Sequence, residues 1–224
     1  MILQPNSRLL FIGDSITDCG RERPVGEGAF DQALGNGFVS LVDAALAAAY
    51  PDYAISTINM GVSGNTVRDL KARWKTDVLD LQPDWLTIKI GINDVWRHFS
   101  RPQQREPQIS VEEYAQTLDQ LVQEVRPHLR GLIVMTPYFL EPNRREPMRA
   151  MMDQYGKAAG EVAARHNALL VDTQAAIDGV LQWVHPMQLA VDRVHPNLAG
   201  HMVLARAFLQ GIGYSWERSP SLEA

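Results

Sequence analysis

The sequence predicts an α/β fold in which a mostly parallel sheet of five strands is covered by helices on both faces. Two observations lead to this prediction. Short apolar runs of strand length alternate along the chain with longer segments of helical period, a pattern typical of β-α-β units with right-handed crossovers. The apolar runs are also continuous, as expected for strands that are buried on both faces of a parallel sheet.

The expected strands all end at chain-breaking or turn residues. The first three run into glycines, the fourth stops at Pro137 and the fifth at Asp172. In order, these strands are Leu9–Ile12, Ala54–Asn59, Trp85–Ile90, Gly131–Thr136 and Ala168–Val171.

The expected helices lie between and after these strands. In order, they are Phe38–Ala49, Thr66–Leu81, Val111–Val125, Pro147–His166, Gln174–Trp183 and Asn197–Leu209. Ser110 is a good N-cap for the third, with Glu113 placed to close a capping box. These elements account for most of the chain, so we expect residues 1–224 to form a single domain.

Composition and charge exclude several classes of protein. The chain has 21 Lys and Arg against 26 Asp and Glu, a net charge of −5, and no basic stripe that would favour nucleic-acid binding. No stretch approaches the roughly 20 apolar residues that span a bilayer, and we expect no membrane association. The single Cys19 excludes an internal disulfide framework and fits a reducing compartment. We therefore expect a cytoplasmic protein.

Two long irregular stretches interrupt the pattern, at Cys19–Gly37 and Arg97–Ile109. Loops of this length in a compact domain are usually functional or contact a partner. They could serve as lids or as subunit contacts, and mobile surface loops are the alternative.

Residues with catalytic potential follow four of the five expected strands. In open α/β sheets, ligands bind beyond the carboxyl ends of the strands, so these fragments should meet at one edge. They are Gly13–Asp18 (GDSITD), Gly61–Thr66 (GVSGNT), Gly91–Asp94 (GIND) and, after a further helix, Asp192–Pro196 (DRVHP).

Ser15 is the candidate nucleophile, because it follows a strand and a glycine where a helix would begin. The alternative is a purely local role, since Ser15 and Asp18 also match a capping box. A serine hydroxyl needs a base within reach. Of the histidines, His185 and His195 are the rivals, and only His195 has an aspartate, Asp192, three residues earlier to orient its ring.

Donors for an oxyanion are available in the same fragments. The backbone N–H groups of Ser15 and Gly64 and the side-chain amide of Asn93 could form an oxyanion hole. In isolation, Gly64 and Asn93 are more typical of turns. Trp96 and Tyr138 lie just past the third and fourth strands and could stack on a sugar or belong to the core.

Together these segments resemble the SGNH (GDSL-type) hydrolase family, with all four blocks in order between positions 13 and 195. The resemblance implies a three-layer α/β/α sandwich of the SGNH hydrolase, flavodoxin-like type. It also implies a serine mechanism without metal or other cofactor, with Ser15, Asp192 and His195 as catalytic residues and Ser15, Gly64 and Asn93 as the oxyanion hole.

Longer segments narrow the resemblance to the intracellular bacterial acetylxylan (acetyl-xylooligosaccharide) esterases. These segments are Gly13–Gly20, Gly64–Trp74, Gly91–Arg97, Met152–Gly156 and Asp192–Ala207. The implied partners are a small acetylated carbohydrate as substrate and further copies of the chain in a homo-oligomer. Arg144, Arg145 and Arg149 form a basic cluster that we expect on a solvated face or at a subunit contact.

Three rival interpretations stay open at this point. The first is a carboxylesterase, lysophospholipase or thioesterase for longer acyl chains. The second is a metal-dependent hydrolase recruiting Asp14, Asp94, Asp192 and His195, although no ligand spacing supports it. The third is a catalytically silent carbohydrate-binding protein.

Overall fold

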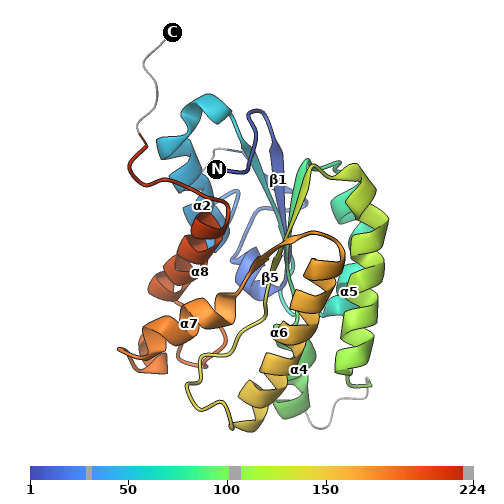
Figure 1. The fold of residues 1–224 in the computed structure, drawn as a ribbon, viewed down its shortest axis with the longest axis vertical. Coiled ribbons are helices and arrows are strands. Elements are labelled where there is room, and N and C mark those ends of the chain that lie inside the picture. The colour runs from blue at the N-terminus through green and yellow to red at the C-terminus, as the bar shows by residue number, and fades with distance from the viewer. Residues whose placement is uncertain (29–31, 101–106, 219–224) are drawn as a thin grey trace.

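The computed structural model describes residues 1–28, 32–100 and 107–218, and its central sheet is mostly parallel (Figure 1). Within the described residues the sheet has six strands in the order β2-β3-β1-β4-β5-β6, and only β2 is antiparallel to its neighbour. The strands are β1 (Arg8–Gly13), β2 (Gly26–Glu27), β3 (Ser56–Gly61), β4 (Trp85–Lys89), β5 (Gly131–Met135) and β6 (Leu169–Val171).

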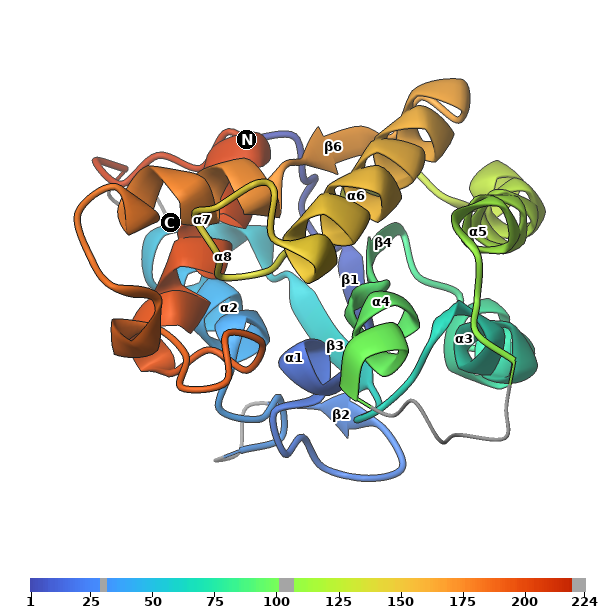
Figure 2. The same cartoon turned by 90° about the horizontal axis from the view of Figure 1, so that it is seen from below.

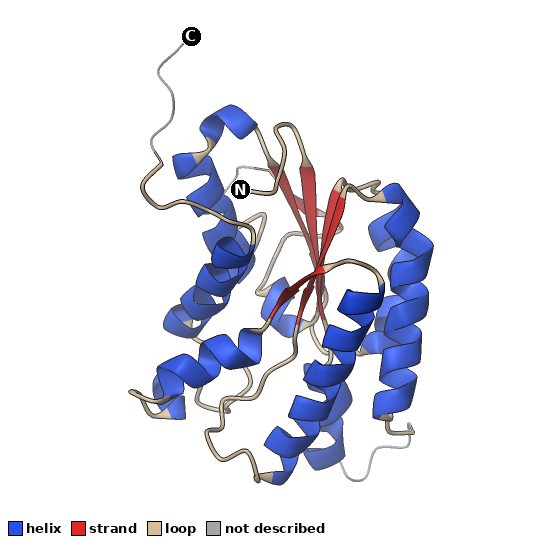
Figure 3. Cartoon of the chain, viewed as in Figure 1, coloured by secondary structure: helices blue, strands red, loops and turns tan. Residues whose placement is uncertain are grey.

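Helices cover both faces of the sheet, as the sequence predicts (Figure 3). On one face α2 packs against α8 and α8 against α7; on the other α5 packs against α3 and α6. The helices are α1 (Ser15–Asp18), α2 (Phe38–Ala49), α3 (Val67–Trp74), α4 (Ile92–Ser100), α5 (Val111–Val125), α6 (Pro147–Arg165), α7 (Thr173–Leu181) and α8 (Leu198–Gly211). Short α1 and α4 follow β1 and β4 and lie at the carboxyl edge of the sheet (Figure 2).

The core lies between the sheet and these helices. The ring of Phe11 on β1 contacts Phe38 at the start of α2 and Phe208 on α8, with ring centroids 5.7 and 5.0 Å apart. All three side chains are fully buried, and burying each such ring contributes about 1.5–3 kcal/mol. Among the described helices, none has both the length and the hydropathy required to cross a bilayer.

Three elements differ from the prediction. The sheet has a sixth strand, β2, because Gly26 and Glu27 pair with Asn59 and Ile58 at the edge. A two-residue strand has no periodicity to detect. Helix α4 fills the first part of the stretch expected to be irregular, and a π-helical turn at Lys75–Leu79 follows α3 where one continuous helix was expected. Residues 29–31 and 101–106 of the two long stretches lie outside the described residues.

Helix capping agrees with the prediction in part. The Ser110 side chain accepts a hydrogen bond from the Glu113 N–H, as expected of an N-cap. The Glu113 carboxylate, however, pairs with the Arg68 guanidinium instead of closing the box. A complete capping box occurs at α3, between Thr66 and Asp69.

Candidate active site

Ser15 is the first residue of α1, but it is not the cap of that helix. The cap is Asp14, whose Oδ1 accepts a hydrogen bond from the Ile16 N–H at 2.9 Å. Asp18 does not close a capping box with Ser15, because its Oδ2 accepts from the Ser63 N–H and hydroxyl and from Arg23. The local alternative for Ser15 is therefore wrong, and its hydroxyl is free to serve another partner.

That partner is His195, whose Nε2 lies 3.0 Å from the Ser15 Oγ. The two residues are 180 positions apart in the sequence and meet at the carboxyl edge of the sheet. On the other side of the ring, His195 Nδ1 lies 2.6 Å from Asp192 Oδ2. The hydroxyl, the imidazole and the carboxylate thus form one continuous line of hydrogen bonds, the arrangement that lets a serine become a nucleophile.

The turn between Asp192 and His195 fixes the carboxylate toward the ring. Asp192 Oδ1 accepts from the backbone N–H groups of Val194 and His195, which leaves Oδ2 for the imidazole. Burial alone would raise the pKa of Asp192, but these hydrogen bonds from the His195 ring and from the two N–H groups lower it below its ordinary value. Asp192 therefore stays ionised and holds the Nδ1–H tautomer of His195.

The loop after β3 presents the Gly64 N–H beside Ser15. Asp18 anchors this loop through Ser63, and Arg97 donates to the Gly64 carbonyl at 2.6 Å. Gly64 has a φ of +82°, a left-handed conformation that glycine adopts without strain. Among the hydrogen bonds of the described residues, none uses the Gly64 N–H or the Ser15 N–H, so both donors are available to a ligand.

Asn93 supplies a third donor from α4. Its side chain is only 5% exposed, and one amide hydrogen goes to the Asn65 carbonyl at 2.9 Å. The second amide hydrogen remains for a ligand, since a side-chain amide carries two. Arg73 fixes the same region by donating to the Asn65 side chain and to the carbonyls of Met60 and Gly13.

A hollow of about 520 Å³ connects these groups. It is lined by Ser15, Ser63, Gly64, Asn93, Trp96, Arg97, Ser100 and His195. Trp96 packs edge-on against His195, with ring centroids 5.5 Å apart, which agrees with its expected place beside the site. Sequence reasoning missed Ser63, Arg97 and Ser100, because polar residues in an expected loop carry no signal of their direction.

Tyr138 belongs to the core, the second of the two roles expected for it. Its side chain is fully buried, and its hydroxyl donates to the Val194 carbonyl at 3.2 Å. No face of the ring is open to a sugar, so the predicted stacking role is wrong. Tyr138 instead supports the backbone immediately before His195.

Two further histidines, His185 and His201, take structural roles. His185, the rival base, accepts from the Met187 N–H at its own turn. His201 is buried on α8, where Nδ1 accepts from the Phe38 N–H and Nε2 lies 3.3 Å from the Cys19 sulfur.

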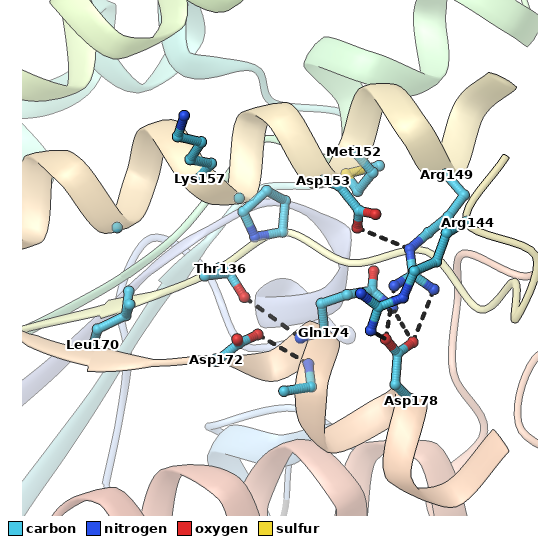
Figure 4. Close-up of a pocket in the computed structure, with 14 residues that line it drawn as sticks. Thr136, Arg144, Arg149, Met152, Asp153, Lys157, Leu170, Asp172, Gln174 and Asp178 are labelled. Carbon is cyan, nitrogen blue, oxygen red and sulfur yellow. Dashed lines mark hydrogen bonds and ion pairs between the residues drawn. The ribbon is translucent and has the colours of Figure 1, made fainter. Parts of the chain in front are cut away.

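The basic cluster agrees with the prediction in part, because Arg144 and Arg145 are exposed but Arg149 is not. Arg149 is only 1% exposed and bonds Asp153, both oxygens of Asp178 and the Glu141 carbonyl. It lies in a second hollow of about 360 Å³ between α6 and α7, with Arg144 also paired to Asp178 (Figure 4). Arg149 is thus the buried member of an ion-pair network whose carboxylates are partly exposed, and it is not on a solvated face.

Of the residues suggested for a metal site, only Asp192 and His195 are shown in contact with each other among the described residues. Asp14 and Asp94 each accept a hydrogen bond from an N–H at a helix N-terminus. Asp14 accepts from the Ile16 N–H, and Asp94 accepts from the Val67 N–H. Within residues 1–28, 32–100 and 107–218, no group of three or more His, Cys, Asp or Glu side chains could hold a metal ion.

Comparison with known proteins agrees with this geometry. Residues 11–203 match the model of the GDSL-like lipase/acylhydrolase family. The chain is 54% identical to an acetylxylan esterase from Geobacillus stearothermophilus over 98% of this chain and 100% of that protein.

Solved structures give the same result. The crystal structure of Axe2, an acetylxylan esterase from Geobacillus stearothermophilus, superposes with a TM-score of 0.96 at 54% identity, over 98% of this chain and 100% of that one. LAE5, an α/β hydrolase from the metagenome of Lake Arreo, superposes with a TM-score of 0.93 at 51% identity, over 95% and 98% of the two chains. Catalytic mutants of Axe2 replace a serine, an aspartate and a histidine, the last two being three positions apart. The chain belongs to the GDSL-like lipase/acylhydrolase family.

Proposed function

We propose that this protein is a serine esterase that removes acetyl groups from acetylated xylo-oligosaccharides or related carbohydrates, with residues 1–224 acting as one hydrolase domain. The observation that carries the proposal is the hydrogen-bonded line from Ser15 through His195 to Asp192. The 54% identity to an acetylxylan esterase supports the choice of substrate.

The reaction begins with attack of the Ser15 Oγ on the acetyl carbonyl. His195 Nε2 accepts the hydroxyl proton, and ionised Asp192 stabilises the imidazolium that forms. Negative charge develops on the carbonyl oxygen, which the N–H groups of Ser15 and Gly64 and the Asn93 amide stabilise. These donors are fixed in advance by Asp14, Arg97 and the Asn65 carbonyl, so little reorganisation is needed during the reaction.

The intermediate collapses when the bond from the acetyl carbon to the sugar oxygen breaks. His195 returns its proton to that oxygen, and the deacetylated sugar leaves. His195 then takes a proton from water, which attacks the carbonyl of the acetyl-Ser15 ester. The bond from the acetyl carbon to Ser15 Oγ breaks as His195 returns the proton to that oxygen, which releases acetate and restores the serine hydroxyl. Every proton and bond in this cycle is handled by the serine, the imidazole and water, so the reaction requires no cofactor.

The lining of the catalytic hollow supports a sugar rather than a fatty chain. Ser63, Arg97 and Ser100 give it hydroxyl and guanidinium groups, and Trp96 adds the one large aromatic ring among its lining residues. Aromatic faces and fixed hydrogen-bonding groups are suited to carbohydrates. We assign the binding of the sugar to Trp96.

We further infer that the protein is a cytoplasmic homo-oligomer. Several large apolar residues are exposed to solvent in the single chain. The exposed fraction is 86% for Trp183, 80% for Val191 and 61% for Trp216. We expect those that lie together on the surface to contact another copy of the chain, because contiguous exposed apolar patches mark interaction sites. The lone thiol of Cys19 fits a reducing compartment. Light scattering of the purified protein should give a mass that is a multiple of 25.0 kDa, and a monomer would contradict the oligomer.

The function is tested by measuring acetate release from acetylated xylo-oligosaccharides beside a panel of simple acetate and octanoate esters. We expect the acetylated sugars to give the highest kcat/KM and octanoate esters to be poor substrates. Preference for octanoate would favour a long-chain carboxylesterase, lysophospholipase or thioesterase. Binding of the sugar without turnover of any ester would favour a silent carbohydrate-binding protein.

A further inference from the structure

A lysine is buried directly behind the catalytic serine. Lys89 is the last residue of β4 and is 1% exposed, which is rare for lysine unless an opposite charge lies nearby. The register of the sheet pairs it with Gly13, the last residue of β1. Its position is therefore beside the chain that continues through Asp14 into Ser15.

Asp14 provides the opposite charge. Its side chain is also fully buried, with Oδ1 accepting from the Ile16 N–H at the start of α1. The second oxygen, Oδ2, and the Lys89 Nζ make no hydrogen bond with any described residue. Burial raises the pKa of Asp14 and lowers that of Lys89, while the charge of each group acts on the other in the opposite direction. Each charge thus helps to keep the other ionised.

Several titratable groups lie around this pair. The Asp94 carboxylate interacts electrostatically with Asp14, and burial raises the pKa of Asp94 to about 7. His195 also acts on Asp14, but of the charges that lower the pKa of Asp14 that of Lys89 has the largest effect.

Three further groups near the pair carry no charge near neutral pH. Burial and the charges of Asp18 and Asp14 raise the pKa of the Cys19 thiol to about 12. Burial and the Lys89 charge lower the pKa of His201 to about 4, and burial and the Asp14 charge raise the pKa of Tyr138 well above its ordinary value.

Lys89 also contacts the support of the catalytic histidine. Its Nζ lies 4.7 Å from the centre of the Tyr138 ring, a cation–π contact. The hydroxyl of the same tyrosine donates to the carbonyl of Val194, the residue before His195. The buried ammonium thus contacts Tyr138, which supports the backbone before His195, and its strand is paired with the strand that leads into Asp14, the cap of α1.

We propose that Lys89 is a positioning residue for the hydrolytic reaction, holding Ser15 and His195 in mutual reach through Asp14 on one side and Tyr138 on the other. The proposal rests on the proposed function, because it needs Ser15 and His195 to act as a pair. It assigns Lys89 no contact with substrate. Without the ammonium, the buried Asp14 carboxylate has lost its compensating charge and takes up a proton closer to neutral pH, which weakens its cap on α1.

The test is the pH dependence of kcat in Lys89→Met, which keeps an unbranched side chain and removes the charge. We expect kcat at pH 7 to fall by roughly 10- to 100-fold, the cost of a small misplacement of catalytic groups, with KM little changed. The kcat of the variant should recover as the pH is raised and Asp14 ionises. Its plot of kcat against pH should therefore contain an added rising limb that the unmodified protein lacks. A purely structural role would lower activity equally at all pH values.

The double variant Asp14→Asn/Lys89→Met separates the charge effect from folding. It has no buried carboxylate to titrate, so the added limb should disappear, and it should fold even if Lys89→Met alone does not. A wild-type kcat and pH profile in Lys89→Met would overturn the proposal. So would persistence of the limb in the double variant, or failure of both variants to fold as judged by circular dichroism.

The outcome is distinguishable from failure of the proposed function. If the unmodified protein releases no acetate from any ester, the hydrolase proposal fails before Lys89 is tested. If the unmodified protein is active and Lys89→Met behaves identically at every pH, only the role of Lys89 fails.

Discussion

Two polar hollows lie beyond the carboxyl ends of the strands, and they differ in how far their polar groups are hydrogen-bonded within the protein. The catalytic hollow contains a serine, a histidine, an asparagine and an arginine. The hollow between α6 and α7 contains arginines, aspartates, a glutamine and a lysine (Figure 4). From residue types alone, the second would be the more attractive ligand site, since it carries more charge.

Hydrogen bonding distinguishes the two. In the α6–α7 hollow, Arg149 is bonded to Asp153, Asp178 and a carbonyl, while Gln174 bonds Asp178 and the backbone of Phe139. In the catalytic hollow, the N–H groups of Ser15 and Gly64 have no described partner. A polar hollow can stabilise a transition state when its hydrogen-bond donors are held in position but have no partner in the protein.

The largest effect expected on activity is that of Ser15→Ala. Removing the nucleophile should lower kcat by roughly 10⁴- to 10⁶-fold, as loss of a triad member does, with no loss of folded structure. Ser40→Ala is the matched control, because it also removes one serine hydroxyl, which donates to the Gly37 carbonyl at the start of α2 and does not line the catalytic hollow. Acetate release by Ser15→Ala near the wild-type rate would remove the basis of the mechanism.

Arg149→Met should have its effect on stability instead. It removes the buried guanidinium that bonds Asp153 and Asp178, whose side chains are 36% and 21% exposed, and should cost about 1.5–3 kcal/mol in the free energy of unfolding, with kcat unchanged. Arg144→Met removes an exposed partner of the same Asp178 and should cost less than about 1 kcal/mol. Urea denaturation of both variants gives the comparison. A fall in kcat without destabilisation in Arg149→Met would show that the second hollow takes part in the reaction.

Each hollow contains a side-chain amide, and removing it should affect kcat in one hollow and stability in the other. Asn93→Ala should lower kcat by roughly 10²- to 10³-fold, because one oxyanion donor is lost, while KM changes little. Gln174→Ala removes the amide of the α6–α7 hollow and should leave kcat unchanged, with a loss of about 1–3 kcal/mol in stability. Equal loss of kcat in both variants would contradict the assignment of the oxyanion hole.

A pH dependence of stability is expected from Asp94, beneath the catalytic hollow. Burial raises the pKa of Asp94 from 3.8 to about 7, despite the hydrogen bond from Val67. Between these values the folded state binds more protons than the unfolded state, so the contribution of Asp94 to stability falls as the pH rises from about 4 to about 7.

The slope of this contribution is about 1.4 kcal/mol per pH unit in the middle of that window. Asp94→Asn keeps an oxygen for the Val67 N–H and cannot titrate. The variant should therefore gain stability relative to the unmodified protein as the pH is raised through the window, measured by urea denaturation at several pH values. A constant difference across this range would show that Asp94 is already ionised when folded.

Periodicity in the sequence predicted the sheet and most helices, because buried strands and amphipathic helices leave a signal over many residues. The bounds of α2 and α5 match the prediction. The edge strand β2 and helix α4 were not predicted. The first is held by pairing to β3 alone, and the second begins inside a catalytic motif whose glycine and asparagine resemble a turn.

The site could be predicted where chemistry requires a particular order of residue types. Ser15, His195 and Asp192 meet as expected, because parallel strands bring their carboxyl ends to one edge. The burial of Tyr138 and Arg149 could not be predicted, since direction and pairing depend on tertiary contacts. Asp18 resembled a local helix cap, and only the structure shows its bond to Ser63 across 45 positions.

The most direct test of the account is a crystal structure of the protein after reaction with a serine-directed phosphonate, which mimics the tetrahedral intermediate. We expect the phosphorus on Ser15 Oγ, and one phosphonyl oxygen within hydrogen-bond distance of the Ser15 N–H, the Gly64 N–H and the Asn93 amide. Attachment at another residue, or an oxygen that none of these three donors reaches, would contradict it.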